Sequence, residues 1–207
     1  MKTIACIGTG PSVTIQQADI ARQKGFELYV CNNAFQLATD AALIYGCNYE
    51  WWKHYHKYVK DFPMEKWTTN RQAADEFGIN HINEKFMWGL SEDPDVISHG
   101  HGSGFSLVSM AHRAGADRIV LLGYDMKYAP DYDGKARSIG SQPRHFFGNG
   151  EYPEKMQHWP SVQVRRGVHV ELVELYRAVK GQGLVEIVNC TPGSAIDCFE
   201  RKHIEEL

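Results

Sequence analysis

The feature that most constrains this chain of 207 residues is a glycine-rich turn near its N-terminus. A short apolar run from Thr3 to Ile7 leads into Gly-Thr-Gly-Pro-Ser at positions 8–12, and an amphipathic stretch follows from Thr14 to Lys24. This order predicts a strand, a tight turn and a helix. Glycine lacks the Cβ that keeps a ligand away from the backbone, and a helix N-terminus favours an anion such as phosphate. The turn therefore indicates a nucleotide site, with a plain strand-to-helix connection as the alternative.

The turn differs from the two common glycine-rich nucleotide motifs. A dinucleotide-binding G-x-G-x-x-G motif would place its third glycine where this chain has Val13. It would also place Asp or Glu after the second strand, expected at Glu27–Cys31, but Asn32 and Asn33 follow instead. A P-loop would need a lysine, which the turn lacks. We therefore expect neither an NAD-type site nor a Walker-type site.

Strand-like and helix-like runs alternate along the chain, which predicts an α/β fold: a mostly parallel sheet with helices on both faces. The strand-like runs fall at 3–7, 27–31, 41–45, 66–69, 79–82, 118–122 and 184–189, and the helix-like runs at 14–24, 34–37, 48–58, 71–77, 105–114, 161–180 and 200–207. The clearest helix is 161–180, because its Val and Leu residues form one continuous stripe. Residues 84–95 are expected to be irregular. With no repeat and no linker, we expect one domain over 1–207.

The segment from Lys127 to Tyr152 has no hydrophobic periodicity and is rich in glycine and polar residues. An irregular segment of this length in a compact domain is usually functional. It follows the strand at 118–122, and open α/β sheets bind ligands at the carboxyl ends of their strands. We therefore predict a lid over approximately residues 127–160.

Polar segments that follow the strands are predicted to meet at one edge, because the carboxyl ends of parallel strands lie together. A second glycine-rich helix start, at positions 102–104, should point into the same crevice and suit a phosphate. Asn32 and Asn33 offer donors and acceptors for a ribose or a base, with a helix N-cap as the alternative. Ser103 is expected to be the N-cap of the helix at 105–114. The residues predicted to bind a nucleotide are Gly8, Thr9, Gly10, Pro11, Ser12, Asn32, Asn33, Gly102, Ser103, Gly104, Thr191 and Ser194.

Four further side chains at this edge are candidates for catalysis. Asp125 directly follows the strand at 118–122 and can bind a ribose, orient a catalytic group or hold Mg²⁺, with a buried turn-capping carboxylate as the alternative. Tyr128 and Tyr132 lie in the predicted lid, and their phenols can stabilise a leaving phosphate without a metal. His145 can act as a general base, since histidine titrates near neutral pH, with a surface histidine beside aromatic residues as the alternative.

The stretch from Tyr49 to Tyr58 is rich in aromatic residues. One interpretation is a helix that packs its aromatic face on the sheet. The other is a surface that stacks on an acceptor or a base. The same helix could form an interface in a homo-oligomer.

Composition gives no indication of a nucleic-acid or membrane partner. The net charge of −3 provides no overall attraction to nucleic acid or a membrane surface, and no apolar run approaches the ~20 residues of a membrane-spanning helix. Five scattered cysteines without a CxxC pair, and no secretory signal sequence, predict a reduced cytoplasmic protein. The ten histidines show neither HExxH nor Cys/His zinc spacing, so no metal site is expected.

Five motifs in a fixed order carry a resemblance to a known superfamily. They are Gly-Thr-Gly-Pro-Ser ending at Ser12, Val-Cys-Asn at Asn32, Gly-Ser-Gly at Gly104, Leu-Gly-Tyr-Asp at Asp125 and Thr-Pro-Gly-Ser at Ser194. In this order they resemble a Rossmann-like superfamily that includes bacterial sialyltransferases using CMP-sialic acid and 6-hydroxymethylpterin diphosphokinase-like proteins. The chain also resembles small phage-encoded members, which would place it in the host cytoplasm.

The resemblance to the sialyltransferases implies roles for individual residues. Two lid tyrosines of that family contact the leaving phosphate, which implies this role for Tyr128 and Tyr132. The family's histidine base corresponds to Asn149, so His145 is a neighbour of that position. The residues that would bind the CMP part of the donor are Gly8, Gly10, Ser12, Asn32, Ser103 and Gly104.

We therefore expect a nucleotide-binding transferase, in first place a metal-independent glycosyltransferase with a nucleotide-sugar donor and no required cofactor. The acceptor stays open. One alternative is a Mg²⁺-dependent diphosphokinase-like enzyme in which Asp125 holds Mg²⁺-ATP. A second alternative is a non-catalytic module that binds and sequesters a nucleotide.

Overall fold

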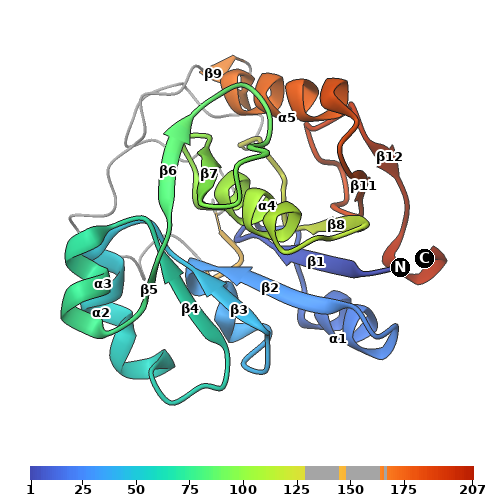
Figure 1. Ribbon diagram of the computed structural model, residues 1–207. Coiled ribbons are helices and arrows are strands. Elements are labelled where there is room, and N and C mark those ends of the chain that lie inside the picture. Colours follow the sequence, from blue (N-terminus) through green and yellow to red (C-terminus); the bar gives the residue numbers. More distant parts are fainter. Residues whose placement is uncertain (129–144, 148–163, 166) are drawn as a thin grey trace.

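The computed structural model describes residues 1–128, 145–147, 164–165 and 167–207, and its centre is an eight-stranded sheet (Figure 1). The strand order is β12-β11-β8-β1-β2-β3-β4-β5, and all its pairings are parallel. The expected α/β architecture is therefore confirmed. The strands are β1 Thr3–Ile7, β2 Glu27–Cys31, β3 Leu43–Tyr45, β4 Glu65–Thr68, β5 Asn80–His81, β8 Arg118–Leu122, β11 Glu186–Asn189 and β12 Glu200–Arg201.

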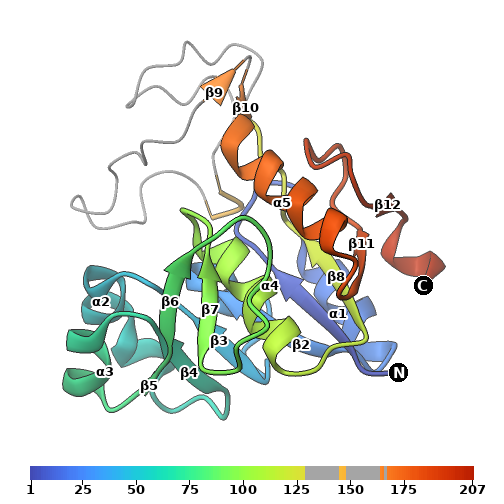
Figure 2. The same ribbon diagram turned by 45° about the horizontal axis from the view of Figure 1, so that its top comes forward.

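Helices cover both faces of this sheet (Figures 1 and 2). Alternate residues of β1 explain why: Ile4 and Cys6 belong to one buried cluster, while Ala5 and Ile7 belong to the other. The first cluster includes residues of α4 and α5, and the second includes residues of α1, η1, α2 and α3. The helices are α1 Ile15–Gln23, η1 Asn32–Gln36, α2 Tyr49–Val59, α3 Arg71–Phe77, α4 Ser103–Arg113, α5 Val170–Gln182 and η3 Ile204–Glu206.

The strand order places a topological switch point beside β1. From β1 the chain passes through β2, β3, β4 and β5 in one direction, and β8 then returns to the other side of β1. Ile7 pairs with Val30 on one side and with Leu122 on the other, so the carboxyl ends of the three central strands are level. Ligands of open α/β sheets bind where the strand order reverses in this way, which directs attention to the ends of β1 and β8.

The expectation that residues 84–95 are irregular is wrong for residues 84–86, which belong to a strand, and holds for residues 87–95. Strands β6 (Asn83–Phe86) and β7 (Val96–His99) pair in parallel and form a separate ribbon beside α4 (Figure 2). The residues of β6 are all exposed, so this strand lacks the apolar alternation by which a strand is recognised.

Two expected helix boundaries also differ. The helix expected at 161–180 is α5, which begins only at Val170, because Val164–Arg165 (β9) and Val168–His169 (β10) pair as an antiparallel hairpin. Gly167 between them has φ 76°, a left-handed conformation that interrupts a helix. The terminal helix expected at 200–207 is strand β12 followed by the short η3. Among the helices that the structure describes, none has both the length and the apolar character needed to cross a bilayer.

The aromatic helix α2 uses its largest side chains for packing. Trp51 and Trp52 are fully buried, and the Trp52 indole N–H donates to the Gly46 carbonyl at 2.8 Å. The Trp51 indole N–H donates to Oδ1 of Asn33 at 2.8 Å, and Asn33 is itself fully buried. The structure therefore places Asn33 in the core beneath α2, where its carbonyl satisfies a buried indole.

Replacing Asn33 by alanine should destabilise the fold by about 2–4 kcal/mol, because it leaves the buried Trp51 N–H unpaired and creates a cavity. Denaturant unfolding monitored by circular dichroism measures this loss. The matched control is Asn80→Ala on the edge strand β5, where the side chain is exposed and the cost should be small. Equal effects of the two substitutions would contradict the assignment of Asn33 to the core.

Candidate functional site

The turns that follow β1 and β8 lie against each other at the switch point. The Gly8 N–H donates to the Leu122 carbonyl at 2.8 Å, and the Gly10 N–H donates to the Gly123 carbonyl at 3.0 Å. A Cβ on Gly8 would lie 2.7 Å from the Gly123 oxygen, and one on Gly10 would collide with the Asp125 carboxylate. The sequence suggests that these glycines make room for a ligand, but the space beside them is occupied by the β8 turn. Their small size is needed to bring the two turns together.

Asp125 is the acidic group of this crevice. Its side chain is 7% exposed, and its Oδ2 accepts a hydrogen bond from the Ser12 hydroxyl at 2.9 Å. Burial raises the pKa of the Asp125 carboxyl, although the Ser12 contact and nearby Lys127 act in the opposite direction. A carboxylate held in this environment is costly for the fold, and such groups are concentrated at functional sites.

Thr191 and Ser194, which follow β11, are hydrogen-bonded to the backbone of the turn that follows β8. The Thr191 hydroxyl accepts from the Tyr124 N–H at 3.0 Å, and the Ser194 hydroxyl donates to the Tyr124 carbonyl at 2.6 Å. The Ala195 N–H donates to the Asp125 carbonyl at 2.9 Å. Both hydroxyls are buried and bonded to the backbone. Their position indicates that they orient Asp125, whereas the sequence suggests a direct contact with the nucleotide.

The N-terminus of α4 meets the end of β8 through Tyr124. The fully buried Tyr124 donates its phenol O–H to the Gly104 carbonyl at 3.0 Å, and a Cβ on Gly104 would lie 3.2 Å from its ring. The N-cap is Gly102 and not Ser103 as expected, so Ser103 is the first helical residue. Its hydroxyl lies 3.3 Å from the Cys47 sulfur. Because no side chain of the described residues caps this end, the first N–H groups of the helix, those of Ser103 and Gly104, can serve an anion.

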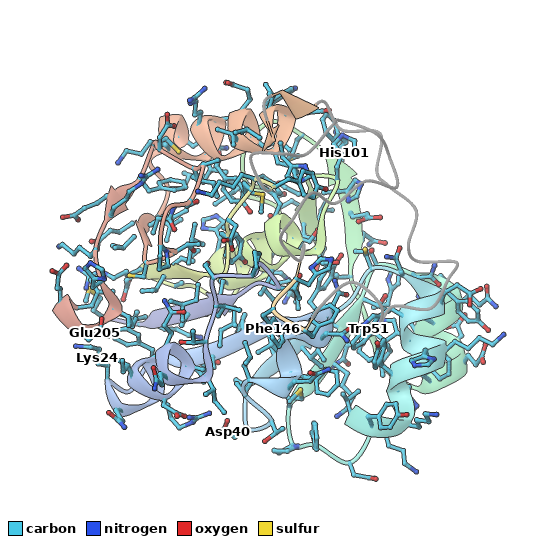
Figure 3. The ribbon with its side chains drawn as sticks, turned by 180° about the vertical axis from the view of Figure 1, so that it is seen from behind. Lys24, Asp40, Trp51, His101, Phe146 and Glu205 are labelled. Carbon is cyan, nitrogen blue, oxygen red and sulfur yellow. The ribbon has the colours of Figure 1, made fainter. Side chains whose placement is uncertain are left out.

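Two histidines before α4 connect it to its neighbours. Nδ1 of His99 lies 3.3 Å from Glu84 of β6, and Nε2 of His101 lies 3.2 Å from Glu171 in the first turn of α5. Figure 3 shows His101 near the start of α5. Within the ranges that the structure describes, no three His, Cys, Asp or Glu side chains form a group that could hold a metal ion.

Asn32 follows β2 at the same edge of the sheet and has a positive φ of 47°. Its Oδ1 is buried and makes no hydrogen bond to any residue that the structure describes. A buried acceptor without a partner is rare in a folded protein, because its desolvation is uncompensated. A donor such as a ribose hydroxyl or a base amine would satisfy it.

His145 lies directly on the glycine-rich turn. Its Nδ1 is 3.0 Å from the Thr9 hydroxyl, and the neighbouring Phe146 N–H donates to the Thr9 carbonyl at 3.2 Å. The Phe147 ring stacks on the imidazole with centroids 4.9 Å apart. Phe146 packs against the buried cluster that contains Trp51, and Figure 3 labels both on the face of the sheet that α1 and α2 cover. These contacts fix the orientation of the His145 ring.

Tyr128 is held by the β9–β10 hairpin. Its N–H donates to the Gly167 carbonyl at 2.6 Å, and its ring lies 4.7 Å from the ring of His169. Burial lowers the pKa of His169 to about 4, so this imidazole is neutral at physiological pH. Tyr132, Asn149 and most of the predicted lid lie outside the described residues.

The structure thus joins several predicted residues by direct contact: Ser12 to Asp125, and Thr9 to His145. Pro11 lies in the turn between these contacts. The sequence analysis does not single out Tyr124, which connects the β8 turn to α4. Its place between Gly123 and Asp125 is the signal that could have identified it. Cys47 is likewise not singled out, although it follows β3 at the same edge and burial raises the pKa of its thiol.

Replacing Asp125 by asparagine should change how stability depends on pH. Because burial raises the folded-state pKa of this carboxyl above its unfolded value, the folded protein binds more protons between the two values. The contribution of Asp125 to stability is therefore present at low pH and is lost as pH rises through this window. The amide of Asp125→Asn can still accept from Ser12 but does not titrate.

The free energy of unfolding of both proteins, measured between about pH 4 and pH 8, checks this expectation. The wild type should lose stability relative to Asp125→Asn as pH rises. A constant difference across the range, or one that changes in the opposite direction, would show that the carboxyl is not destabilised by burial.

No protein-family model matches this chain, and no curated protein matches it by sequence. Among solved structures it is similar to the sialyltransferase CstII from Campylobacter jejuni in complex with the substrate analogue CMP-3FNeuAc, with a TM-score of 0.62 and 12% identity over 100% of this chain and 89% of that chain. A structure of CstII with cytidine-5'-monophosphate matches with a TM-score of 0.57 and 13% identity, over 97% of this chain and 84% of that chain. At this level of identity the similarity shows the fold, and the Rossmann-like architecture implied by the resemblance is confirmed.

Proposed function

We propose that this protein is a glycosyltransferase that uses a nucleotide-sugar donor. The observation that carries the proposal is the contact between His145 and Thr9, which holds an imidazole on the glycine-rich turn at the topological switch point. The fold shared with CstII supports it, because the structures of that sialyltransferase contain CMP-3FNeuAc and cytidine-5'-monophosphate.

The nucleotide would bind across the ends of β1, β2 and α4. The unpaired Oδ1 of Asn32 would accept a hydrogen bond from the ribose or the base. The N–H groups at the start of α4, beside Gly102 and Ser103, would bind the phosphate. The Ser12–Asp125 pair would lie beneath the nucleotide and keep the two turns in register.

His145 would act as the general base. Nδ1 lies 3.0 Å from the Thr9 hydroxyl, and Nε2 is the ring nitrogen that would accept the proton of an acceptor hydroxyl. The acceptor oxygen then forms a bond to the anomeric carbon as the bond from that carbon to the phosphate oxygen breaks. The nucleotide leaves with the electron pair of the broken bond. The phenol of Tyr128 and the N–H groups of α4 would stabilise the charge on its phosphate, so the mechanism needs no metal.

Replacing His145 by alanine should lower the rate of sugar transfer or donor hydrolysis by about 10²–10⁴-fold while donor binding is kept. The measurement is nucleotide release from a panel of nucleotide-sugars that includes CMP-sialic acid, followed by chromatography. Calorimetry measures binding in parallel. Tyr128→Phe should also lower turnover, since it removes a donor to the leaving group.

His81→Ala is the matched control, because His81 is a half-buried histidine on the edge strand β5, away from the switch point. Turnover that survives His145→Ala unchanged would overturn the role of His145. Mg²⁺-dependent ATP binding that is lost in Asp125→Asn would instead favour a diphosphokinase-like enzyme. Tight nucleotide binding without turnover of any donor would favour a sequestering module.

A further inference from the structure

A second concave site is lined by residues of η1 and α2 and by none of the crevice residues named above. It is a pocket of about 540 Å³, within the roughly 300–1,000 Å³ typical of small-molecule sites. No residue that lines it contacts the Gly8–Ser12 turn or the β8 turn in any interaction described above. The lining residues come from η1, α2 and the segment after α2: Phe35, Gln36, His54, Tyr55, Tyr58 and Phe62.

The aromatic rings of this pocket are inclined to one another and not parallel. The planes of Phe35 and Tyr55 make an angle of 62°, those of Phe35 and Phe62 an angle of 53°, and those of Tyr55 and Tyr58 an angle of 50°. A flat base or another aromatic ring binds best between parallel faces, which none of these pairs provides. A puckered ring with C–H groups pointing in several directions can instead meet several tilted ring faces, whose negative charge attracts C–H groups.

The polar groups of the pocket lie at its rim. Gln36, His54 and Tyr58 are exposed and bring an amide, an imidazole and a phenol, whereas Phe35 and Tyr55 are buried and form the floor. Of the lining residues that the structure describes, none is Asp, Glu, Lys or Arg, although the Lys57 ammonium lies 4.8 Å from the centroid of the Tyr58 ring. The pocket therefore suits a neutral ligand with an apolar face and hydroxyl groups around its edge.

The floor of the pocket is rigid before any ligand arrives. Tyr55 stacks on Trp51 with ring centroids 5.2 Å apart, and Trp51 is fixed by its hydrogen bond to Asn33. Tyr58 lies one turn after Tyr55 and is 52% exposed, so its ring is accessible at the edge of the pocket. A preformed aromatic floor lowers the entropic cost of binding a weakly held ligand.

From these observations we propose that the pocket on α2 is a carbohydrate-binding site for a neutral pyranose ring. The apolar face of the sugar would lie on Tyr55 and Tyr58, and its hydroxyls would bond to Gln36 and His54. This inference does not depend on the chemistry proposed for the crevice, because it concerns a different set of side chains.

Saturation-transfer NMR tests the proposal on the full chain without any nucleotide. The probes are methyl glycosides of glucose, galactose and N-acetylglucosamine, with adenosine and cytidine as planar competitors. Magnetisation transfer from the protein to the glycoside protons should be observed, and glycoside binding should change the fluorescence of Trp51. Tyr58→Ala should weaken glycoside binding by about 10-fold. Tyr58→Phe, which keeps the ring, should retain most of the binding.

Trp88→Ala is the matched control, since Trp88 is 55% exposed, close to the 52% of Tyr58, but does not line the pocket. Donor turnover in Tyr58→Ala should stay at the wild-type level, which separates this site from the crevice. The proposal is overturned if no glycoside binds in the millimolar range, if the nucleosides bind in a Tyr58-dependent way instead, or if light scattering shows a dimer that Tyr58→Ala dissociates.

Discussion

The pairing of β1 with β8 continues beyond the ends of both strands, and the candidate site depends on this continuation. Gly8 and Gly10 extend the ladder of backbone hydrogen bonds into the turns. The buried hydroxyls of Thr191 and Ser194 then fix the β8 turn from the other side. The turn that carries Asp125 is therefore held on both sides by hydrogen bonds to the turns that follow the neighbouring strands β1 and β11. A site built in this way needs little rearrangement when a ligand binds, which favours the stabilisation of charge.

The adjacent asparagines at the end of β2 show how a structural residue differs from a candidate binding residue. Asn33 is fully buried and its carbonyl is paired with the Trp51 indole, although its Nδ2 has no partner among the described residues. Asn32 has a left-handed backbone and a buried Oδ1 that no described residue satisfies. Natural sequences satisfy their local preferences nearly everywhere and depart from them mainly at functional sites. Asn32 and Asp125 are two such departures at one edge of the sheet.

The central part of the fold could be predicted from the sequence because it depends on local patterns. Strands β1, β2 and β8 are short apolar runs buried on both faces, and such runs are recognisable without knowledge of their partners. Strand β6 could not be found in this way, since its residues are polar and exposed and it is defined only by its pairing with β7. The start of α5 was misplaced because the valines of the β9–β10 hairpin continue the spacing of the helix.

The sequence predicts which residues meet at one edge of the sheet, but it does not predict the contacts among them. Topology alone brings the ends of parallel strands together, so the sequence could place Ser12, Asp125 and Asn32 at one edge. It could not show that the hydroxyls of Thr191 and Ser194 are already bonded to the backbone, because those contacts join residues far apart in the chain. The same reason applies to the contact of His145 with Thr9.

The close approach of the two turns also restricts how this protein can evolve. A Cβ on Gly10 would collide with Asp125, and a Cβ on Gly123 would lie 2.8 Å from the Cβ of Val13. A smaller partner would relieve neither position, because a Cβ on Gly10 would still lie 2.6 Å from the Gly123 carbonyl oxygen and Gly123 has a positive φ of 73°. Both glycines should therefore stay glycine in descendants of this chain for as long as the two turns remain in contact.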